Sequence, residues 1–166
     1  MNKYLYQLEK SLKSFILTYL IVISCGVLVG LAYLSSTTNL SPAGTVTRFN
    51  GSDDSSVTDE LDIKDSYAKP ISEMLITTHN HIFGLSFLFF SIGLIFYFNS
   101  MVQKFWKKFF MIEPLISIII SFGSIWGMRF IDYKFVYLAI ISSTLMYSSF
   151  FIMTAVSMFE LMFKKT

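Results

Sequence analysis

Residues 74–98, MLITTHNHIFGLSFLFFSIGLIFYF, decide the fold class of this chain. The segment is rich in Leu, Ile and Phe and contains no Asp, Glu, Lys or Arg. A helix rises about 1.5 Å per residue, so a segment of this length crosses the roughly 30 Å hydrocarbon layer of a bilayer. We therefore predict a transmembrane helix over these residues.

Three further apolar segments have the same character, at about residues 15–34, 109–130 and 135–163. The whole chain is 54% hydrophobic and only 14% charged, and its mean hydropathy is +0.59. A soluble domain of 166 residues cannot hide that much apolar surface, so the bilayer must be its solvent. We predict an all-α membrane protein in which residues 1–166 form a single four-transmembrane-helix bundle. The net charge of +2 is too small to indicate a nucleic-acid partner.

The lysines gather at one side of the predicted membrane. They flank the first span, fill the short connection between the second and third spans, and follow the fourth span: Lys3, Lys10, Lys13, Lys104, Lys107, Lys108, Lys164 and Lys165. Cytoplasmic connections of membrane proteins carry such an excess of Lys and Arg. The sequence therefore predicts a multi-pass protein of the bacterial inner (cytoplasmic) membrane, with both termini in the cytoplasm and one polar extracytoplasmic loop.

The predicted outer loop, residues 35–72, is polar and acidic. Its acids are Asp53, Asp54, Asp59, Glu60, Asp62 and Asp65, without the residue order of an EF-hand calcium loop. A solvated linker is therefore favoured over a calcium site. At its end, Pro70 and Ser72 are expected to begin the second helix, with Glu73 in the first turn near the positive end of the helix dipole.

Small residues in the spans suggest which helix faces pack closely. Gly26-x-x-x-Gly30 and Gly123-x-x-x-Gly127 have the spacing of close helix contacts. The second span has two small or polar faces, which are Thr77, His81, Gly84 and Ser91 on one side, and His79, Ser86 and Gly93 on the other. We expect this helix to be central, with Phe87 and Phe89 facing lipid.

His79 and His81 are the only histidines, and they lie at the predicted outer boundary, as does Arg129 at the end of the third span. Two interpretations remain open, because His and Arg often anchor helices at the interface, while ionisable groups inside a membrane often mark a site. Residues two apart on a helix point about 200° apart, so both histidines cannot bind one metal ion on a regular helix. The candidate cofactor is haem b or a metal ion held by His79 or His81, with Arg129 pairing a haem propionate. A second axial ligand would have to come from another subunit or from Met128, unless the iron is five-coordinate.

Several short motifs resemble an uncharacterised family of small four-helix bacterial inner-membrane proteins. They are Phe49-x-Gly51, Lys69-x-x-x-Glu73-Met74-Leu75, Thr78-His79-x-His81-x-Phe83 and Ser157-Met158-x-Glu160-Leu161. The resemblance implies the four-span topology and marks the Thr-His-x-His segment at the outer end of the second span. That segment also resembles the haem-ligating helices of respiratory oxidases, although this chain lacks the further histidines that such enzymes need.

These observations favour a non-enzymatic membrane subunit that packs in a respiratory or electron-transfer assembly. The alternative is a free-standing haem- or metal-binding membrane protein with an outer-side histidine site. The expected partners are the lipid bilayer and either other membrane subunits or further copies of the chain. The two acids nearest the cytoplasmic lysines, Glu113 and Glu160, are expected to lie beside those lysines at the interface.

Overall fold

The computed structural model describes residues 4–52 and 67–164, and within them every regular element is a helix. In chain order they are η1 (Leu5–Gln7), α1 (Lys10–Thr38), α2 (Pro42–Asn50), α3 (Ile71–Tyr97), α4 (Lys104–Phe130) and α5 (Phe135–Phe163). Four of them, α1, α3, α4 and α5, are long and apolar enough to cross a membrane. The predicted all-α fold with four membrane-spanning helices is confirmed.

The helix boundaries extend beyond the predicted apolar segments in α1, α3 and α4, whereas α5 matches residues 135–163. Apolar segments mark only the part of a helix inside the hydrocarbon, and the backbone stays helical into the polar region until a cap ends it. In α1 that cap is Asn39, which has a left-handed φ of 50°. The start of α3 is as predicted, because Pro70 precedes its first residue and Glu73 lies in its first turn.

The connection between α1 and α3 contains the short helix α2, which the prediction of a plain linker missed. The local signal is Ser41-Pro42, since the Ser41 hydroxyl accepts a hydrogen bond from the Gly44 N–H at 3.0 Å and proline suits the first helical position. The acids at residues 53–65, on which the calcium question rested, lie outside the described residues.

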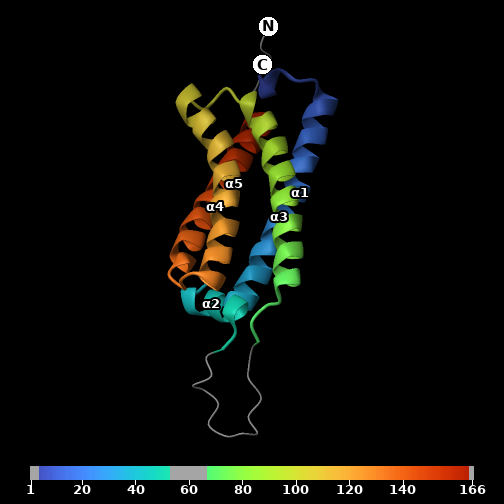
Figure 1. Ribbon diagram of the computed structural model, residues 1–166. Coiled ribbons are helices and arrows are strands. Elements are labelled where there is room, and N and C mark those ends of the chain that lie inside the picture. The colour runs from blue at the N-terminus through green and yellow to red at the C-terminus, as the bar shows by residue number, and fades with distance from the viewer. Residues whose placement is uncertain (1–3, 53–66, 165–166) are drawn as a thin grey trace, which may run out of the picture.

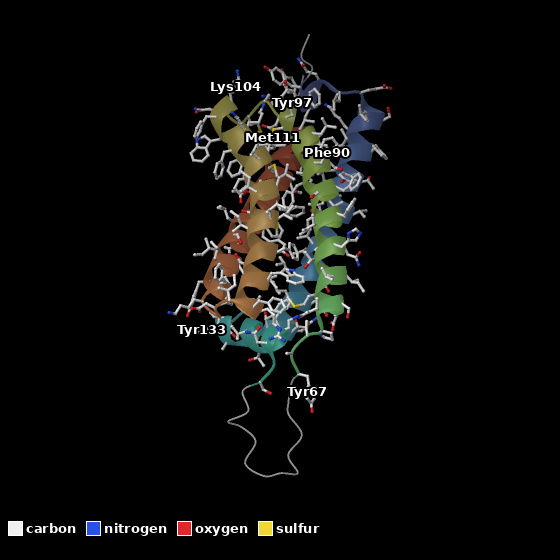
Figure 2. All side chains as sticks on the ribbon, viewed as in Figure 1. Tyr67, Phe90, Tyr97, Lys104, Met111 and Tyr133 are labelled. Atoms are coloured by element: carbon white, nitrogen blue, oxygen red, sulfur yellow. The ribbon has the colours of Figure 1, made fainter. Side chains whose placement is uncertain are left out.

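The two ends of the bundle are different (Figure 1). Both chain ends, η1 and the connection between α3 and α4 lie at one end, which we call the terminal end. There η1 is tied to α3, because the Leu5 N–H donates to the Phe98 carbonyl at 3.0 Å. The short turn between α4 and α5 lies at the opposite end, next to α2, and we call it the α2 end. Figure 2 places Lys104 at the terminal end and Tyr133 at the α2 end.

The central helix is α5, not α3 as predicted. It contacts α1, α2, α3, α4 and η1, and its most extensive contact is with the antiparallel α4. By contrast, Gly84 of α3 is exposed and a Cβ added to it would meet no atom within 4 Å. Phe89, which was expected to face lipid, is instead buried edge-on against Phe150 of α5.

The predicted glycine contacts are also mostly absent. A Cβ added to Gly26, Gly30 or Gly123 would meet nothing within 4 Å, whereas one added to Gly127 would lie 2.9 Å from the Phe135 ring. The small residues that let the helices approach are instead the serines of α4 and α5, nearly all of which are buried where they face each other. A serine side chain is small, so it lets two helix backbones approach closely, as glycine does.

Candidate functional site

The most unusual group in the bundle is the carboxyl group of Glu113, which lies between α4 and α5. Its side chain is only 8% exposed. The Ser117 hydroxyl, one turn along α4, donates to Oε1 at 2.6 Å, and the Ser149 hydroxyl of α5 donates to Oε2. The carboxyl group therefore receives one hydrogen bond from each of the two helices that pack most closely.

The expectation that Glu113 lies beside the lysines at the membrane interface is wrong. No described Lys or Arg forms an ion pair with it, and Lys107 instead donates to the backbone carbonyls of Tyr97 and Asn99. The reason is the direction of the side chain around the helix axis, because Glu113 is on the face of α4 that packs against α5. Burial against α5 therefore determines its surroundings, rather than its distance along the chain from Lys108.

A row of buried polar side chains continues from Glu113 along both helices, and we call it the α4–α5 seam. Its members are Glu113, Ser117, Ser121 and Ser124 on α4, with Ser142, Ser149, Thr154, Ser157 and Glu160 on α5. On α4 the spacings of three and four residues keep these side chains on one helix face. On α5, Ser142, Ser149 and Glu160 share a face, whereas Thr154 lies about 140° round the helix from Ser149. The Thr154 and Ser157 hydroxyls are buried and have no hydrogen-bond partner in the described part of the chain.

At the terminal end the seam finishes at Glu160, which is fully buried. Its two carboxylate oxygens accept hydrogen bonds from the Ser100 N–H at 2.7 Å and the Ser100 hydroxyl at 2.8 Å. The exposed Lys164 side chain donates to the same Ser100 hydroxyl at 2.8 Å. Glu160 therefore fixes the connection between α3 and α4, close to solvent and one side chain away from a lysine.

The two histidines have different neighbours, as the prediction from helix geometry requires. His79 is exposed, and its ring lies against Phe83 of its own helix, with 5.0 Å between ring centroids. The His81 ring lies 5.6 Å from Phe122 of α4, and its Nδ1 is 2.8 Å from the Thr77 carbonyl. In the described chain no group of three or more His, Cys, Asp and Glu side chains is placed to hold a metal ion.

His79 belongs to an exposed row on α3, which we call the α3 stripe: Ile76, His79, Asn80, Phe83, Phe87 and Phe90. The 27 residues of α3 span about 40 Å, roughly 10 Å more than the hydrocarbon layer. If the excess is shared equally between the two ends, His79 lies about 7 Å inside the hydrocarbon. With that placement, the stripe carries two exposed polar side chains at the depth of the hydrocarbon.

Arg129 lies at the α2 end, where it is half-buried beside the Phe130 ring. Its Nε is buried without a hydrogen-bond partner in the described residues, and no described hydrogen bond joins it to either histidine. Nearby, Asn50 of α2 donates to the Met128 carbonyl at 3.3 Å. Arg129 thus lies at the end of α4 that contacts α2, a helix that the sequence had not predicted.

An open pocket also lies at the α2 end, between the last turns of α1 and α2. It has a volume of about 580 Å³ and is lined by Tyr33, Thr37, Thr38, Asn39, Gly44, Thr47, Arg48 and Lys69. Both of its cations have partners, because Arg48 lies over the Tyr33 ring and Lys69 pairs with Glu73 at 2.8 Å. Lys69 is therefore paired with an acid, whereas Arg48 has only the neutral Tyr33 as a described partner.

Sequence reasoning missed the seam, although a signal for it exists. Glu113, Ser117, Ser121 and Ser124 recur every three or four residues within the apolar part of α4, and Ser142, Ser149 and Ser157 recur about every two turns of α5. A polar row at helical spacing on each of two consecutive spans indicates that the two rows face each other. The prediction for Glu113 considered only the lysines near it in the sequence and therefore did not use this pattern.

Comparison with known families gives one match. Residues 39–166 match the Aq_1264_TM family, which is described as a transmembrane helical domain. The chain belongs to this family. No curated protein and no solved structure matches the chain. The matched range begins at Asn39, the residue that caps α1, so the family domain comprises α2 to α5 and contains both the seam and the α3 stripe.

Proposed function

We propose that this multi-pass membrane protein is a non-enzymatic subunit of a larger assembly in the bacterial inner membrane, of the respiratory or electron-transfer kind. The observation that supports the proposal is the α3 stripe. His79 and Asn80 are exposed at membrane depth, and the residues around them are exposed aromatic and aliphatic side chains. Polar groups facing hydrocarbon are costly, so they usually face protein or water.

A second transmembrane helix, from another subunit or another copy of the chain, would cover the stripe. Its backbone or side chains would give His79 and Asn80 hydrogen-bond partners, and its apolar residues would pack against Phe83 and Phe87. Interhelical hydrogen bonds in membranes contribute about 0.6 kcal/mol on average, and packing adds to this. This proposal places the contact on α3, which contacts fewer elements of the chain than α5 does.

Site-specific photocrosslinking in native membranes tests the subunit proposal. A photoreactive amino acid at Phe83 should crosslink to a protein partner. The matched control is Ile141 of α5, which is exposed and at nearly the same depth by helix register. Crosslinks at Phe83 but not at Ile141 support a partner on the stripe, and only lipid adducts at both positions would contradict it.

The alternative function is a free-standing haem- or metal-binding protein, and one observation favours His81 as the ligand. Its Nδ1 is within hydrogen-bond distance of the Thr77 carbonyl, which leaves Nε2 free. Metal-binding histidines commonly donate their other ring N–H to a backbone carbonyl in this way. In this version Arg129 would pair a haem propionate and His79 would serve a separate contact.

A visible absorption spectrum of the purified protein separates the two functions. A haem protein would show a Soret band that His81→Ala removes and His79→Ala leaves in place. A colourless protein without bound metal that still crosslinks through Phe83 would support the subunit and exclude the haem site.

A further inference from the structure

Among the described residues no cation pairs with the buried carboxyl group of Glu113, and this points to a role beyond packing. We propose that Glu113 is a proton-binding site that exchanges its proton with water at the terminal end of the bundle. The proposal does not depend on the assembly proposed above. It rests on the burial of the group, its hydrogen bonds and the polar side chains that lie between it and solvent.

An unpaired carboxylate inside a membrane is unfavourable, because charged groups there are normally paired, bound to a metal or neutralised by a proton. Glu113 is 8% exposed and lies well within α4. The described chain provides neither an ion pair nor a set of metal ligands around it. A bound proton is then the simplest cation that satisfies the site.

The hydrogen bonds around Glu113 suit either protonation state. With the carboxylate charged, the Ser117 and Ser149 hydroxyls both donate to it. When a proton adds to Oε2, that oxygen becomes a donor, and the Ser149 hydroxyl can accept from it. The Ser149 hydroxyl then turns its own hydrogen toward the Leu145 carbonyl one turn back. Ser142 and Ser148 of the same helix already make such bonds to the carbonyls of Leu138 and Thr144.

Polar groups also lie between Glu113 and the terminal end. On α4, Pro114 has no N–H, so the Phe110 carbonyl one turn toward that end lacks its usual helical donor. On α5, the Thr154 and Ser157 hydroxyls are buried without partners, and Glu160 and Ser100 follow. Lys164 then contacts Ser100 from the exposed surface. These groups lie along the chain between Glu113 and the exposed Lys164, and in the proposal they pass the proton between solvent and Glu113.

The ionisable residues in the parts of α3, α4 and α5 toward the terminal end, with the C-cap Lys164, are Tyr97, Lys104, Lys107, Lys108, Tyr147, Glu160 and Lys164. None of them is hydrogen bonded to Glu113. The other carboxyl group on the proposed route is that of Glu160.

Infrared difference spectroscopy tests the proposal. Spectra of the full-length protein in lipid vesicles, recorded from alkaline to acidic pH, should show a new carbonyl band of a protonated buried carboxyl group. Glu113→Gln should abolish that band while the variant stays folded, because the amide still accepts from Ser117 and can donate to Ser149. Glu160→Gln is the matched control and should leave the band in place.

Two results would overturn the proposal. If Glu113→Gln leaves the pH difference spectrum unchanged, Glu113 keeps one protonation state and only joins the two helices. If sodium at constant pH removes the band as alkali does, the site binds a metal cation rather than a proton. The route has its own test, since the double variant Thr154→Val and Ser157→Ala should slow appearance of the band after a pH jump several-fold. An unchanged rate would exclude those hydroxyls.

Discussion

The α3 stripe and the α4–α5 seam both place polar side chains in apolar helices, yet their surroundings are opposite. Glu113 in the seam is buried and bonded to Ser117 and Ser149, whereas His79 on the stripe is exposed and has only an aromatic neighbour from its own helix. The chain itself supplies the hydrogen-bond partners of Glu113 and Glu160 in the seam. The stripe is left for something outside the chain, which is why the two regions support different proposals.

The comparison extends to how the bundle holds together. Helices in a membrane gain no hydrophobic advantage from leaving lipid for each other, so close packing and hydrogen bonds must hold them. The seam supplies both, and α5 is accordingly the helix that meets all the others. Helix α1, by contrast, buries only Leu20 and Thr38 and lies outside the matched family domain.

The largest expected effect is in cysteine labelling, which shows which end of the bundle faces the cytoplasm and which faces the periplasm. In a protein whose Cys25 is replaced by Ser, a cysteine at Ser55 should label almost completely with an impermeant reagent from the periplasmic side. A cysteine at Gln103, at the terminal end, should remain unlabelled until the membrane is opened. The reason is the excess of lysines at the terminal end. The reverse pattern would invert the orientation and place the proton route on the periplasmic side.

The next largest effect is a change of stability at the seam. Ser149→Leu both overfills the close α4–α5 contact and removes a donor from Glu113. These two costs are about 1–3 kcal/mol each, so the folded state should lose about 2–6 kcal/mol. The matched control is Ser148→Leu, at an exposed neighbour that bonds only to its own helix, with an expected change within about 0.5 kcal/mol. Equilibrium unfolding in mixed micelles measures both, and equal losses would mean that the seam is not a close contact.

The spans were predictable from sequence because hydropathy is a property of a segment. A long apolar segment such as residues 74–98 is accommodated in a bilayer as a helix that crosses it. Rotation of each helix about its axis was not predictable in the same way. Gly84 and Gly93 lie on faces that looked equally suitable for packing, yet only Gly93 is buried, near Met111 of α4. Which face is used depends on the partner helix, and the sequence of one span does not contain that information.

The candidate sites show the same limit. The divergence of His79 and His81 followed from helix geometry alone, because both residues are on one helix. The surroundings of Glu113 required Ser149, which is distant in sequence and reaches Glu113 only through the α4–α5 hairpin. The helix α2 was missed because its signal, Ser41-Pro42, is short and lies in a polar segment that hydropathy cannot interpret.

A smaller effect is expected from the two glycines of α4. Gly127→Ala would place a methyl group 2.9 Å from the Phe135 ring, so it should destabilise the chain by about 1–3 kcal/mol. Gly123→Ala meets open space and should be neutral or slightly stabilising, since alanine favours the helix. The same micelle unfolding assay compares them. A larger loss at Gly123 would mean that a partner helix covers that face of α4, outside the contacts of a single chain.

The smallest expected effect tests how the α3 stripe is held in position. The Trp126 Nε1–H donates to the Thr78 hydroxyl at 3.0 Å, which joins α4 to α3 one residue before His79. Membrane hydrogen bonds of this kind average about 0.6 kcal/mol in double-mutant cycles. Trp126→Phe and Thr78→Val, made singly and together, should therefore give a coupling energy of about 0.5–1 kcal/mol. If the coupling is near zero while Ser149→Leu remains severe, the chain is held by its seam, and the orientation of the stripe depends on its partner. If the coupling instead exceeds the loss at Ser149, the α3–α4 contact is the stronger one, and the contrast between the two regions does not hold.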